Sequence, residues 1–278
     1  MMIEIKDLTF QYDTNGERVL DDISLKIEEG KHVGIIGSNG CGKTTLVRHL
    51  DGLLSPTAGD VWVEGMNTKD RIDVQKIRQM VGMVFQNPDN QIVGMSVEED
   101  VAFGPCNLGL PPIDIRKRVE TSLAMVGLEK YAKLPPHTLS NGEKQLVAIA
   151  GVLAMNPTYI VLDEPTTYLD PSGKKKILRV ITQLNKQGIT IIHVTHDMDE
   201  IAEADEIVVL HHGKIALRAE PAEVFIRVEW LRSMGVDIPK ITQLMWQLNQ
   251  MGKDVRTNIF TMDDACMELS SLIKAETS

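Results

Sequence analysis

The most informative segment of this sequence is Gly37-Ser38-Asn39-Gly40-Cys41-Gly42-Lys43-Thr44-Thr45. It fits the phosphate-loop pattern and lies between an apolar run, Val33 to Ile36, and a helical run, Thr45 to Leu54. The glycines let backbone N–H groups turn toward phosphate oxygens, Lys43 neutralises β/γ charge, and Thr44 can ligate Mg²⁺. A glycine-rich turn without a ligand is the alternative, and the strand-helix context disfavours it. We therefore expect a phosphate loop between a strand and a helix.

Two carboxylates follow a second apolar run. Tyr159 to Leu162 is typical of a strand buried on both faces, and Asp163 and Glu164 come directly after it. Parallel strands present the residues at their ends to a ligand crevice, so Asp163 can hold Mg²⁺ and Glu164 can polarise an attacking water. Alone, such a pair more often caps the next element. The phosphate loop upstream favours the functional interpretation.

A third apolar run, Ile189 to Val194, is followed closely by His196. This predicts that His196 lies beside the phosphates, where it can act as a sensor of the γ-phosphate. A lone histidine is more often a surface or satisfied core residue. Only its place at the end of a predicted core strand distinguishes His196 from His193, His211 and His212.

The composition disfavours several classes of protein. The 278 residues contain 29 Lys+Arg and 39 Asp+Glu, and the formal net charge of −10 lacks the basic field of a general nucleic-acid binder. No apolar run approaches the roughly 20 residues that span a bilayer, and residues 1–7 do not resemble a signal peptide. Cys41, Cys106 and Cys266 fit neither a disulfide framework nor a zinc site, which favours a reducing cytosol. We expect no nucleic acid as a partner and at most a peripheral membrane role.

Other elements are expected around a parallel α/β core. An antiparallel edge is predicted at Ile3 to Phe10, Ser24 to Ile27 and Val61 to Val63. A helical insertion is predicted at Ile113 to Gly127 and Glu143 to Met155.

The sequence predicts a hairpin and then helices toward its end. The hairpin joins Ile207 to Leu210 with Lys214 to Leu217 through Gly213. Beyond Pro221 two apolar helix faces are expected, one of Ile241, Leu244, Met245, Leu248 and Met251, the other of Met262, Ala265, Cys266, Leu269 and Ile273. Thr261 and Asp264 predict a capping box for the last helix.

A further segment, Leu139-Ser140-Asn141-Gly142-Glu143, precedes one of the predicted helices. With the phosphate loop, the two carboxylates and His196, it resembles the ATP-binding-cassette (ABC) ATPases in order, spacing and sequence. The resemblance covers about Ile3 to Glu220.

This resemblance implies a P-loop NTPase fold of the ABC ATPase type, with a parallel core sheet, an antiparallel β subdomain and a helical signature subdomain. The nucleotide-binding domain would comprise residues 1–220, with the helical subdomain at about 90–155. Residues 221–278 would form a C-terminal helical extension that is expected to help pair two ATPase subunits.

The resemblance also implies residue roles. Tyr12 would stack on adenine, Gln86 would link the metal to the membrane partner, and Asp170 would belong to a dimer-contacting loop. Glu164 would be the catalytic carboxylate, with Lys43 and His196 as the other catalytic residues. Mg²⁺ would be held by Thr44, Gln86 and Asp163, and the signature Leu139 to Glu143 would act on ATP bound to the other subunit. Tyr12 as a strand-end aromatic and Gln86 as a turn residue remain the alternatives.

Two segments look like the energy-coupling-factor (ECF) subgroup, importers of vitamins and of nickel or cobalt ions: Val84-Phe85-Gln86-Asn87-Pro88-Asp89-Asn90-Gln91 and Val101-Ala102-Phe103-Gly104-Pro105. This implies ATP and Mg²⁺ as cofactors and a location at the cytoplasmic side of the cell membrane. The implied partners are a second ABC ATPase subunit, a transmembrane coupling protein and a membrane substrate-binding subunit. The solute and the choice between homodimer and heterodimer stay open. The alternatives are another ABC importer or exporter, a soluble cassette protein and a non-hydrolysing regulatory subunit.

The sequence departs from the family pattern in its signature. Asn141-Gly142-Glu143 replaces the usual Gly-Gly-Gln, and Leu146 stands where an Arg is common. Ser140 and Gly142, the hydroxyl and backbone donors, are retained, but Glu143 adds a negative charge near a loop that would face phosphate. Cys106 replaces a Glu that commonly follows Gly-Pro, and nothing in the sequence explains it.

Overall fold

Two β-sheets form the framework of the chain in the computed structural model, which describes residues 2–13, 16–260 and 262–276. The larger sheet has the order β10 (Lys214–Ala219), β9 (Glu206–His211), β3 (His32–Ile36), β8 (Thr190–Val194), β7 (Tyr159–Asp163) and β6 (Val81–Val84). Its strands pair in parallel except for β10, which is antiparallel to β9. The smaller sheet is antiparallel, with the order β2 (Leu20–Glu28), β1 (Met2–Phe10), β4 (Ala58–Val63) and β5 (Met66–Asn67). The parallel core, antiparallel subdomain and hairpin predicted from the sequence are confirmed.

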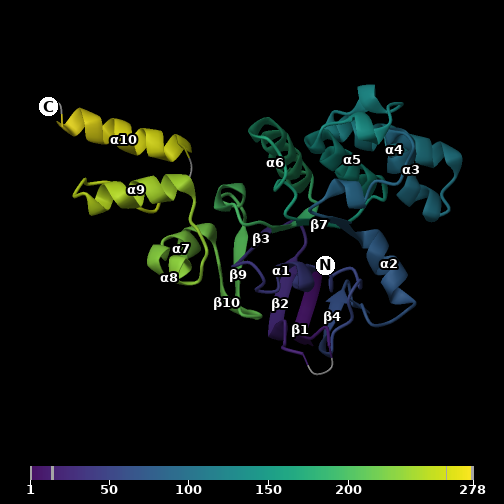
Figure 1. The fold of residues 1–278 in the computed structure, drawn as a ribbon, viewed down its shortest axis with the longest axis horizontal. Helices are drawn as coiled ribbons and strands as arrows, with labels where there is room; N and C mark the ends of the chain where they lie inside the picture. Colours follow the sequence, from purple (N-terminus) through teal and green to yellow (C-terminus); the bar gives the residue numbers. More distant parts are fainter. Residues whose placement is uncertain (1, 14–15, 261, 277–278) are drawn as a thin grey trace.

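Helices surround this framework in distinct groups (Figure 1). The helical subdomain contains α3 (Val97–Asn107), α4 (Pro112–Val126) and α5 (Asn141–Ala154), which pack on one another. Around the core lie α1 (Lys43–Val47), α2 (Asp73–Met80) and α6 (Pro171–Lys186), and the C-terminal region contains α7 (Pro221–Phe225), α8 (Val228–Ser233), α9 (Lys240–Gln250) and α10 (Met262–Glu276). Short 3-10 turns are η1 (Pro88–Asn90), η2 (Glu129–Tyr131), η3 (Pro136–Thr138) and η4 (Met198–Glu200). In the part of the chain that the structure describes, every helix is too short or too polar to cross a bilayer.

The central strands β3, β7 and β8 are buried because their sequences are apolar on both faces. The edge strand β6 was not predicted from the sequence, since it has only four residues and contains Gly82. That glycine has a packing role, because a Cβ there would lie 2.1 Å from Cγ1 of Val152 in α5. Glycine thus lets α5 approach the sheet, and β6 leads directly toward Gln86.

The helix after the phosphate loop is shorter than predicted. The sequence suggested a helical run from Thr45 to Leu54, but α1 ends at Val47. The chain then tightens, with the N–H of Leu50 donating to the carbonyl of Val47, a three-residue spacing in place of four. The left-handed Gly52 completes the turn at φ +70°. The prediction of a longer helix was wrong because local apolar spacing does not reveal where such turns begin.

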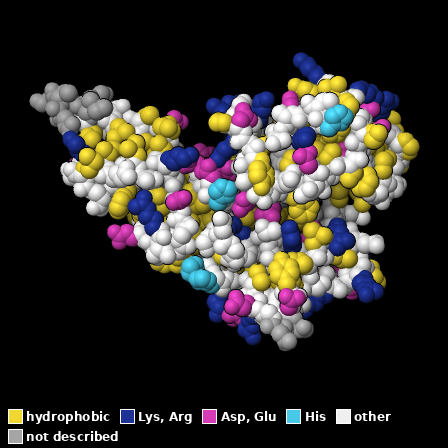
Figure 2. All heavy atoms as spheres, in the orientation of Figure 1, with side chains coloured by type: hydrophobic (Ala, Val, Ile, Leu, Met, Phe, Trp, Pro, Cys, Tyr) yellow, Lys and Arg dark blue, Asp and Glu magenta, His cyan; other side chains and the backbone are white. Residues whose placement is uncertain are grey.

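The C-terminal region packs in two parts. A buried cluster joins α7, α8 and the segment after them to β3 and β9 of the large sheet. Its members include Ile36, Met198, Ile201, Val209, Val224, Phe225, Leu231, Val236 and Ile238. A second, smaller cluster lies between α9 and α10: Met245, Val255, Ile259 and Ala265. Leu244, Met251, Met262 and Met267 are exposed, and hydrophobic side chains are visible on this part of the surface (Figure 2). The capping box proposed for α10 involves Thr261, which lies outside the described residues.

Candidate functional site

The phosphate loop leaves β3 at Gly37 and enters α1 at Lys43. Gly42 has a left-handed φ of +106°, and a Cβ there would lie 2.9 Å from the carbonyl oxygen of Val19, so glycine is required for this turn. Lys43 is 7% exposed, and its Nζ donates to the carbonyl oxygens of Gly37 at 2.9 Å and Ser38 at 3.1 Å. The ammonium therefore lies across the loop, where it can pair with phosphate oxygens.

Two predicted metal ligands meet beside this loop. Thr44 Oγ1 donates to Asp163 Oδ1 at 3.0 Å, although 119 residues separate them in the sequence. Burial raises the pKa of Asp163; the hydrogen bond from Thr44 opposes this rise, and the charge of Glu164 adds to it. A bound cation would offset the burial of this carboxylate, and a hydroxyl with a carboxylate is a donor pair that suits Mg²⁺.

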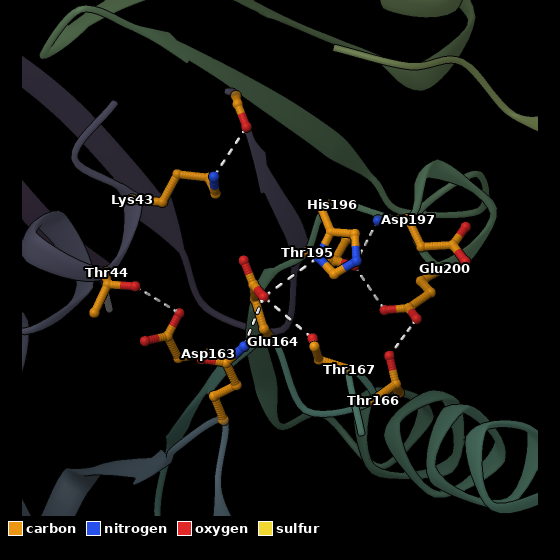
Figure 3. Close-up of polar contacts among 12 residues, drawn as sticks. Lys43, Thr44, Asp163, Glu164, Thr166, Thr167, Thr195, His196, Asp197 and Glu200 are labelled. Atoms are coloured by element: carbon orange, nitrogen blue, oxygen red, sulfur yellow. Dashed lines mark hydrogen bonds and ion pairs between the residues drawn. The ribbon is translucent and has the colours of Figure 1, made fainter. Parts of the chain in front are cut away.

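Three side chains converge on one oxygen of Glu164 (Figure 3). Gln86 Nε2 and Thr167 Oγ1 each donate to Glu164 Oε2 at 3.1 Å, and His196 Nδ1 lies 3.3 Å from the same atom. The backbone of Glu164 has φ +49°, an uncommon left-handed conformation for a residue with a side chain, and its N–H donates to Val194 at 2.9 Å. The loops after β6, β7 and β8 thus meet at one carboxylate.

A buried polar cluster lies behind these loops. Glu200 accepts hydrogen bonds from Thr166 and, at 2.9 Å, from Thr195, while Lys174 Nζ lies 2.9 Å from its other oxygen and His193 Nε2 lies 3.2 Å away. Burial opposes the ionisation of Glu200, but His193 above all, then Thr166 and Lys174, outweigh it and lower the pKa to about 2. This cluster joins the segments after β7 and β8 to α6.

A cavity of about 580 Å³ opens over the phosphate loop. Its lining comes from the loop, from the residues around Glu164 and from the C-terminal region: Gly37, Ser38, Asn39, Gln86, Glu164, Thr167, His196, Met198, Gly235, Val236 and Asp237. The signature residues Leu139 to Glu143 do not contribute to this lining. Of the predicted catalytic residues, Glu164 and His196 line the cavity and Lys43 lies behind it, bound to the carbonyls of Gly37 and Ser38, whereas the signature of the same chain lies elsewhere.

Tyr12 lies at the other end of the phosphate loop. The residue is 58% exposed, and its ring packs edge-on against Phe10, with the ring centroids 4.9 Å apart. Its hydroxyl and Thr45 Oγ1 are 3.1 Å apart. An exposed aromatic face fixed beside the phosphate loop can stack on a planar base.

The signature begins α5 with a capping box. Ser140 is the N-cap, and the Glu143 carboxylate accepts hydrogen bonds from the Ser140 N–H at 2.9 Å and from its Oγ at 2.6 Å. These bonds from Ser140 lower the pKa of Glu143. Glu143 is thus turned back onto its own helix terminus, an arrangement that the sequence pattern of Ser followed by Glu three residues later could have revealed.

The predicted dimer-contacting residue caps a neighbouring helix. Asp170 is the N-cap of α6, and its Oδ1 accepts from the N–H of Gly173 at 3.0 Å. The start of α6 also lies close to the signature, because a Cβ at Gly142 would be 3.3 Å from the Cα of Gly173.

Comparisons with known proteins agree with this geometry. Residues 20–167 match the family model for the ABC transporter family. The chain belongs to the ABC transporter family. It is 52% identical over 270 residues to the cobalt import ATP-binding protein CbiO of Syntrophus aciditrophicus, covering 97% of this chain and 96% of the relative. It is 50% identical over 267 residues to the energy-coupling factor transporter ATP-binding protein EcfA1 of Caldanaerobacter subterraneus, covering 95% and 96%.

Solved structures give the same assignment for this ABC ATPase. CbiO1 of Clostridium perfringens, part of the transporter complex CbiONQ, superimposes with a TM-score of 0.76 at 39% identity and covers 88% of this chain and 98% of the other. The ATP-binding cassette MJ0796, a dimer bound to ADP and phosphate, superimposes with a TM-score of 0.71 at 33% identity, covering 79% and 98%. The chain is therefore an ABC-type ATPase of the energy-coupling-factor kind.

Sequence reasoning missed several residues of this ABC ATPase site. Thr167 lies three residues after Glu164, a spacing that could have suggested a contact. The pairing of Glu200 with His193 left no local signal, because it depends on how η4 packs against β8. Asp237 was missed because it belongs to the C-terminal region, which the sequence presented only as helical.

Proposed function

We propose that this chain is the ATP-hydrolysing subunit that energises an ECF-type ABC importer of vitamins or transition-metal ions. The observation that carries the proposal is the convergence of Gln86, Thr167 and His196 on Glu164 beside the phosphate loop. The names of its relatives, a cobalt importer subunit and ECF transporter subunits, support the subgroup.

The proposed roles follow from the contacts. Glu164 accepts a proton from the attacking water or polarises it, because its carboxylate lies in the cavity and is oriented by three partners. Lys43 and the loop amides bind the β- and γ-phosphates, and Tyr12 stacks on adenine. Bound Mg²⁺ would supply positive charge to the phosphates from a site formed by Thr44 and Asp163. We propose Gln86 as the third ligand of Mg²⁺; in this structure its side chain donates a hydrogen bond to Glu164.

The catalytic site is proposed to be completed by a second ATPase subunit. The cavity lacks any residue of this chain's signature, and at the start of α5 Ser140 is exposed and Gly142 is half-buried. A partner's signature would therefore supply donors to the γ-phosphate over Lys43, while this chain's signature acts at the partner's site. Exposed Leu244, Met251 and Met262 offer an apolar surface for pairing.

The membrane partners are proposed to be a coupling protein and a substrate-binding subunit, at the cytoplasmic side of the membrane. Two contacts connect α5 to the segment around Gln86, which is the segment proposed to meet the membrane partner. Lys144 at the start of α5 pairs with Asp89 of η1 at 2.7 Å, and Gln145 donates to the carbonyl of Phe85 at 3.1 Å. A movement of the loop that contains Gln86 would thus be transmitted to α5, the helix that begins at the signature.

Affinity purification of the tagged chain from detergent-solubilised membranes of its native host tests this proposal. We expect a second ATPase subunit, a coupling protein and a small substrate-binding membrane protein in the complex, together with ATPase activity that Glu164→Gln abolishes. Recovery with ribosomes, or only in the unbound fraction, would contradict an importer role. Binding of labelled cobalt, nickel or vitamins to the complex then identifies the solute.

A further inference from the structure

The segment that carries His196 is held by few hydrogen bonds between its own residues. The imidazole is 55% exposed and is followed by a single 3-10 turn, η4. The side chain of Asp197 caps this turn by accepting from the N–H of Asp199 at 3.1 Å. Such a short turn depends on neighbouring elements for its position.

The catalytic core supplies one set of tethers. Lys174 of α6 forms an ion pair with Asp197, and the N–H of Asp197 donates to Thr195 Oγ1 at 3.0 Å. Lys174 also reaches Glu200 at the end of η4. These contacts fix both ends of the turn to the core; the bond between Asp197 and Thr195 is drawn in Figure 3.

The C-terminal region supplies another tether through Asp199. Its Oδ1 accepts from the backbone N–H of Lys240 at 3.0 Å, and its Oδ2 lies 3.2 Å from Lys240 Nζ. Lys240 is the first residue of α9, whose N-cap, Pro239, offers no side-chain cap. Asp199 therefore caps α9 from another element of the fold, and its charge suits the positive end of that helix.

The segment before α9 contacts the phosphate side of the site. A Cβ at Gly235 would lie 3.7 Å from Cβ of Ser38 in the phosphate loop. Val236 and Ile238 are buried in the cluster that contains Ile36 and Met198. Residues 235–240 thus extend from the phosphate loop to the turn after His196.

We propose that Asp199 is a positioning residue for ATP hydrolysis: because its side chain caps α9 while its backbone N–H binds the side chain of Asp197, it makes the placement of His196 depend on how the C-terminal helices dock. The contacts form a continuous path from Lys240 through Asp199 and Asp197 to His196. This inference rests on the proposed role of His196 in hydrolysis.

Two variants break the path from opposite sides. Asp199→Ala removes the acceptor. Lys240→Pro removes both donors, because proline has no N–H and no ammonium, yet proline is favoured at the first position of a helix. The backbone of Pro239, with φ −52° and ψ 140°, is compatible with a following proline. Glu203→Gln is the matched control. Glu203 and Asp199 both line a cavity of about 580 Å³ whose other walls come from α6, α9 and α10, and the side chain of Glu203 has no hydrogen bond or ion pair within the described residues.

Steady-state ATPase kinetics and thermal unfolding are measured on the full-length chain in its purified complex. We expect kcat to fall roughly three- to tenfold in Asp199→Ala and Lys240→Pro, with KM for ATP and the melting temperature nearly unchanged. The double variant should be no slower than either single variant, because both break one path. Glu203→Gln should match the parent.

The outcomes separate this inference from the role on which it rests. If His196→Ala is impaired but both path variants match the parent, the inference is wrong and the role of His196 stands. If His196→Ala matches the parent, both are wrong. If the losses of kcat multiply in the double variant, the two residues do not act through one path and the inference is wrong. If kcat and the melting temperature fall together while KM rises, Asp199 has a structural role and the inference is also wrong. If Glu203→Gln loses as much kcat as Asp199→Ala, the inference is wrong too, because the loss would then come from removing a negative charge anywhere in this region.

Discussion

At the scale of single residues, the site is built around the unusual position of Glu164. Its left-handed backbone and its bond to Val194 turn the side chain from the end of β7 into the cavity. Gln86, Thr167 and His196 then share one carboxylate oxygen. Because these side chains come from three loops, the carboxylate is oriented before substrate arrives, which is the preorganisation that general-base chemistry needs.

The first prediction concerns this carboxylate. Glu164→Gln should slow ATP hydrolysis roughly tenfold or more while ATP binding is retained, because the lost group acts on water and not on nucleotide affinity. ATPase assays in the assembled complex and titration with ATP measure the two effects. Unchanged hydrolysis would show that Glu164 is not the catalytic carboxylate.

The second prediction concerns the ammonium on the phosphate loop. Lys43→Ala should weaken ATP binding by roughly tenfold to a hundredfold, because a charged hydrogen-bond partner of the phosphates is lost. Titration with ATP tests this, and Lys69→Ala, an exposed lysine outside the cavity, serves as the control. Equal affinities of Lys43→Ala and the parent would contradict a phosphate-binding loop.

The sequence predicted the catalytic pairings that rest on local motifs. Thr44 and Asp163 are far apart in the chain, yet Thr44 comes shortly after β3 and Asp163 ends β7 of the same parallel sheet, so their meeting could be inferred. Glu200 could not be inferred, because a buried carboxylate is recognised only once its tertiary partners are known. The same limit applies to Asp199, whose partner lies in α9.

At the scale of elements, the sequence predicted long or strongly patterned segments and missed short ones. The strands β3, β7 and β8 were evident from their continuous apolar runs. β6 was missed because four residues with an internal glycine give no pattern, and α1 was overextended because Leu50 and its neighbours continue the apolar spacing through a turn. Packing against α5 and the sheet determines where β6 forms and where α1 ends.

The third prediction concerns the turn after α1. His49 is buried, its Nδ1 lies 2.8 Å from the carbonyl oxygen of Thr45, and burial lowers its pKa to about 4, so the unfolded chain takes up this proton at a higher pH than the folded one. Its contribution to stability is therefore lost as pH falls from about 6.5 to about 4. His49→Gln should remove this loss, a difference of about 1.4 kcal/mol per pH unit.

The pH dependence of the variant's unfolding free energy must be compared with that of the parent, because the titration of Asp51 changes stability in the opposite direction. Burial raises the pKa of Asp51 to about 6, so its contribution grows as pH falls through that value. Urea unfolding of His49→Gln and the parent at pH 7, 6 and 5 isolates the histidine. Parallel pH profiles would show that His49 titrates normally in the folded chain.

At the scale of the whole molecule, the C-terminal region is divided in its packing. Residues 221–238 share a buried cluster with the sheet, whereas α9 and α10 have a small cluster of their own and exposed Leu244 and Met251. The expectation that residues 221–278 form a separable extension stays a prediction. The geometry suggests two truncations with different effects.

The fourth prediction compares these truncations. Removal of residues 240–278 should leave a folded ATPase domain that pairs less well with its partner, because the exposed apolar surface of α9 and α10 is lost while the buried residues 221–238 of the cluster stay and lose only the partly buried Trp246 and Phe260. Removal of residues 221–278 should also destabilise the domain, because it uncovers Ile36, Met198 and Val209. Thermal unfolding and sedimentation with ATP measure the two properties. Unchanged pairing of the shorter truncation would reject a role of α9 and α10 at the interface.

The fifth prediction is that the two ATP sites are unequal if the partner carries a regular signature. Each site would combine one subunit's phosphate loop with the other's signature, and this chain supplies the altered one. Asn141 adds a side chain where glycine allows close approach, and the Ser140 hydroxyl is already donated to Glu143. Both features should weaken γ-phosphate stabilisation at the partner's phosphate loop. The site with Lys43 and Glu164 should then carry most of the turnover.

Paired substitutions test this asymmetry in the purified complex. Glu164→Gln in this chain should abolish nearly all ATPase activity, whereas the matching substitution in the partner should cause a much smaller loss, since the partner's phosphate loop faces the weaker signature. Glu143→Gln in this chain should raise the turnover of the partner's site, because it removes a negative charge that binds the Ser140 hydroxyl. Equal losses from the two paired substitutions would contradict the asymmetry. A functional homodimer would remove its premise, because both sites would then contain the same altered signature and would have to hydrolyse ATP with it.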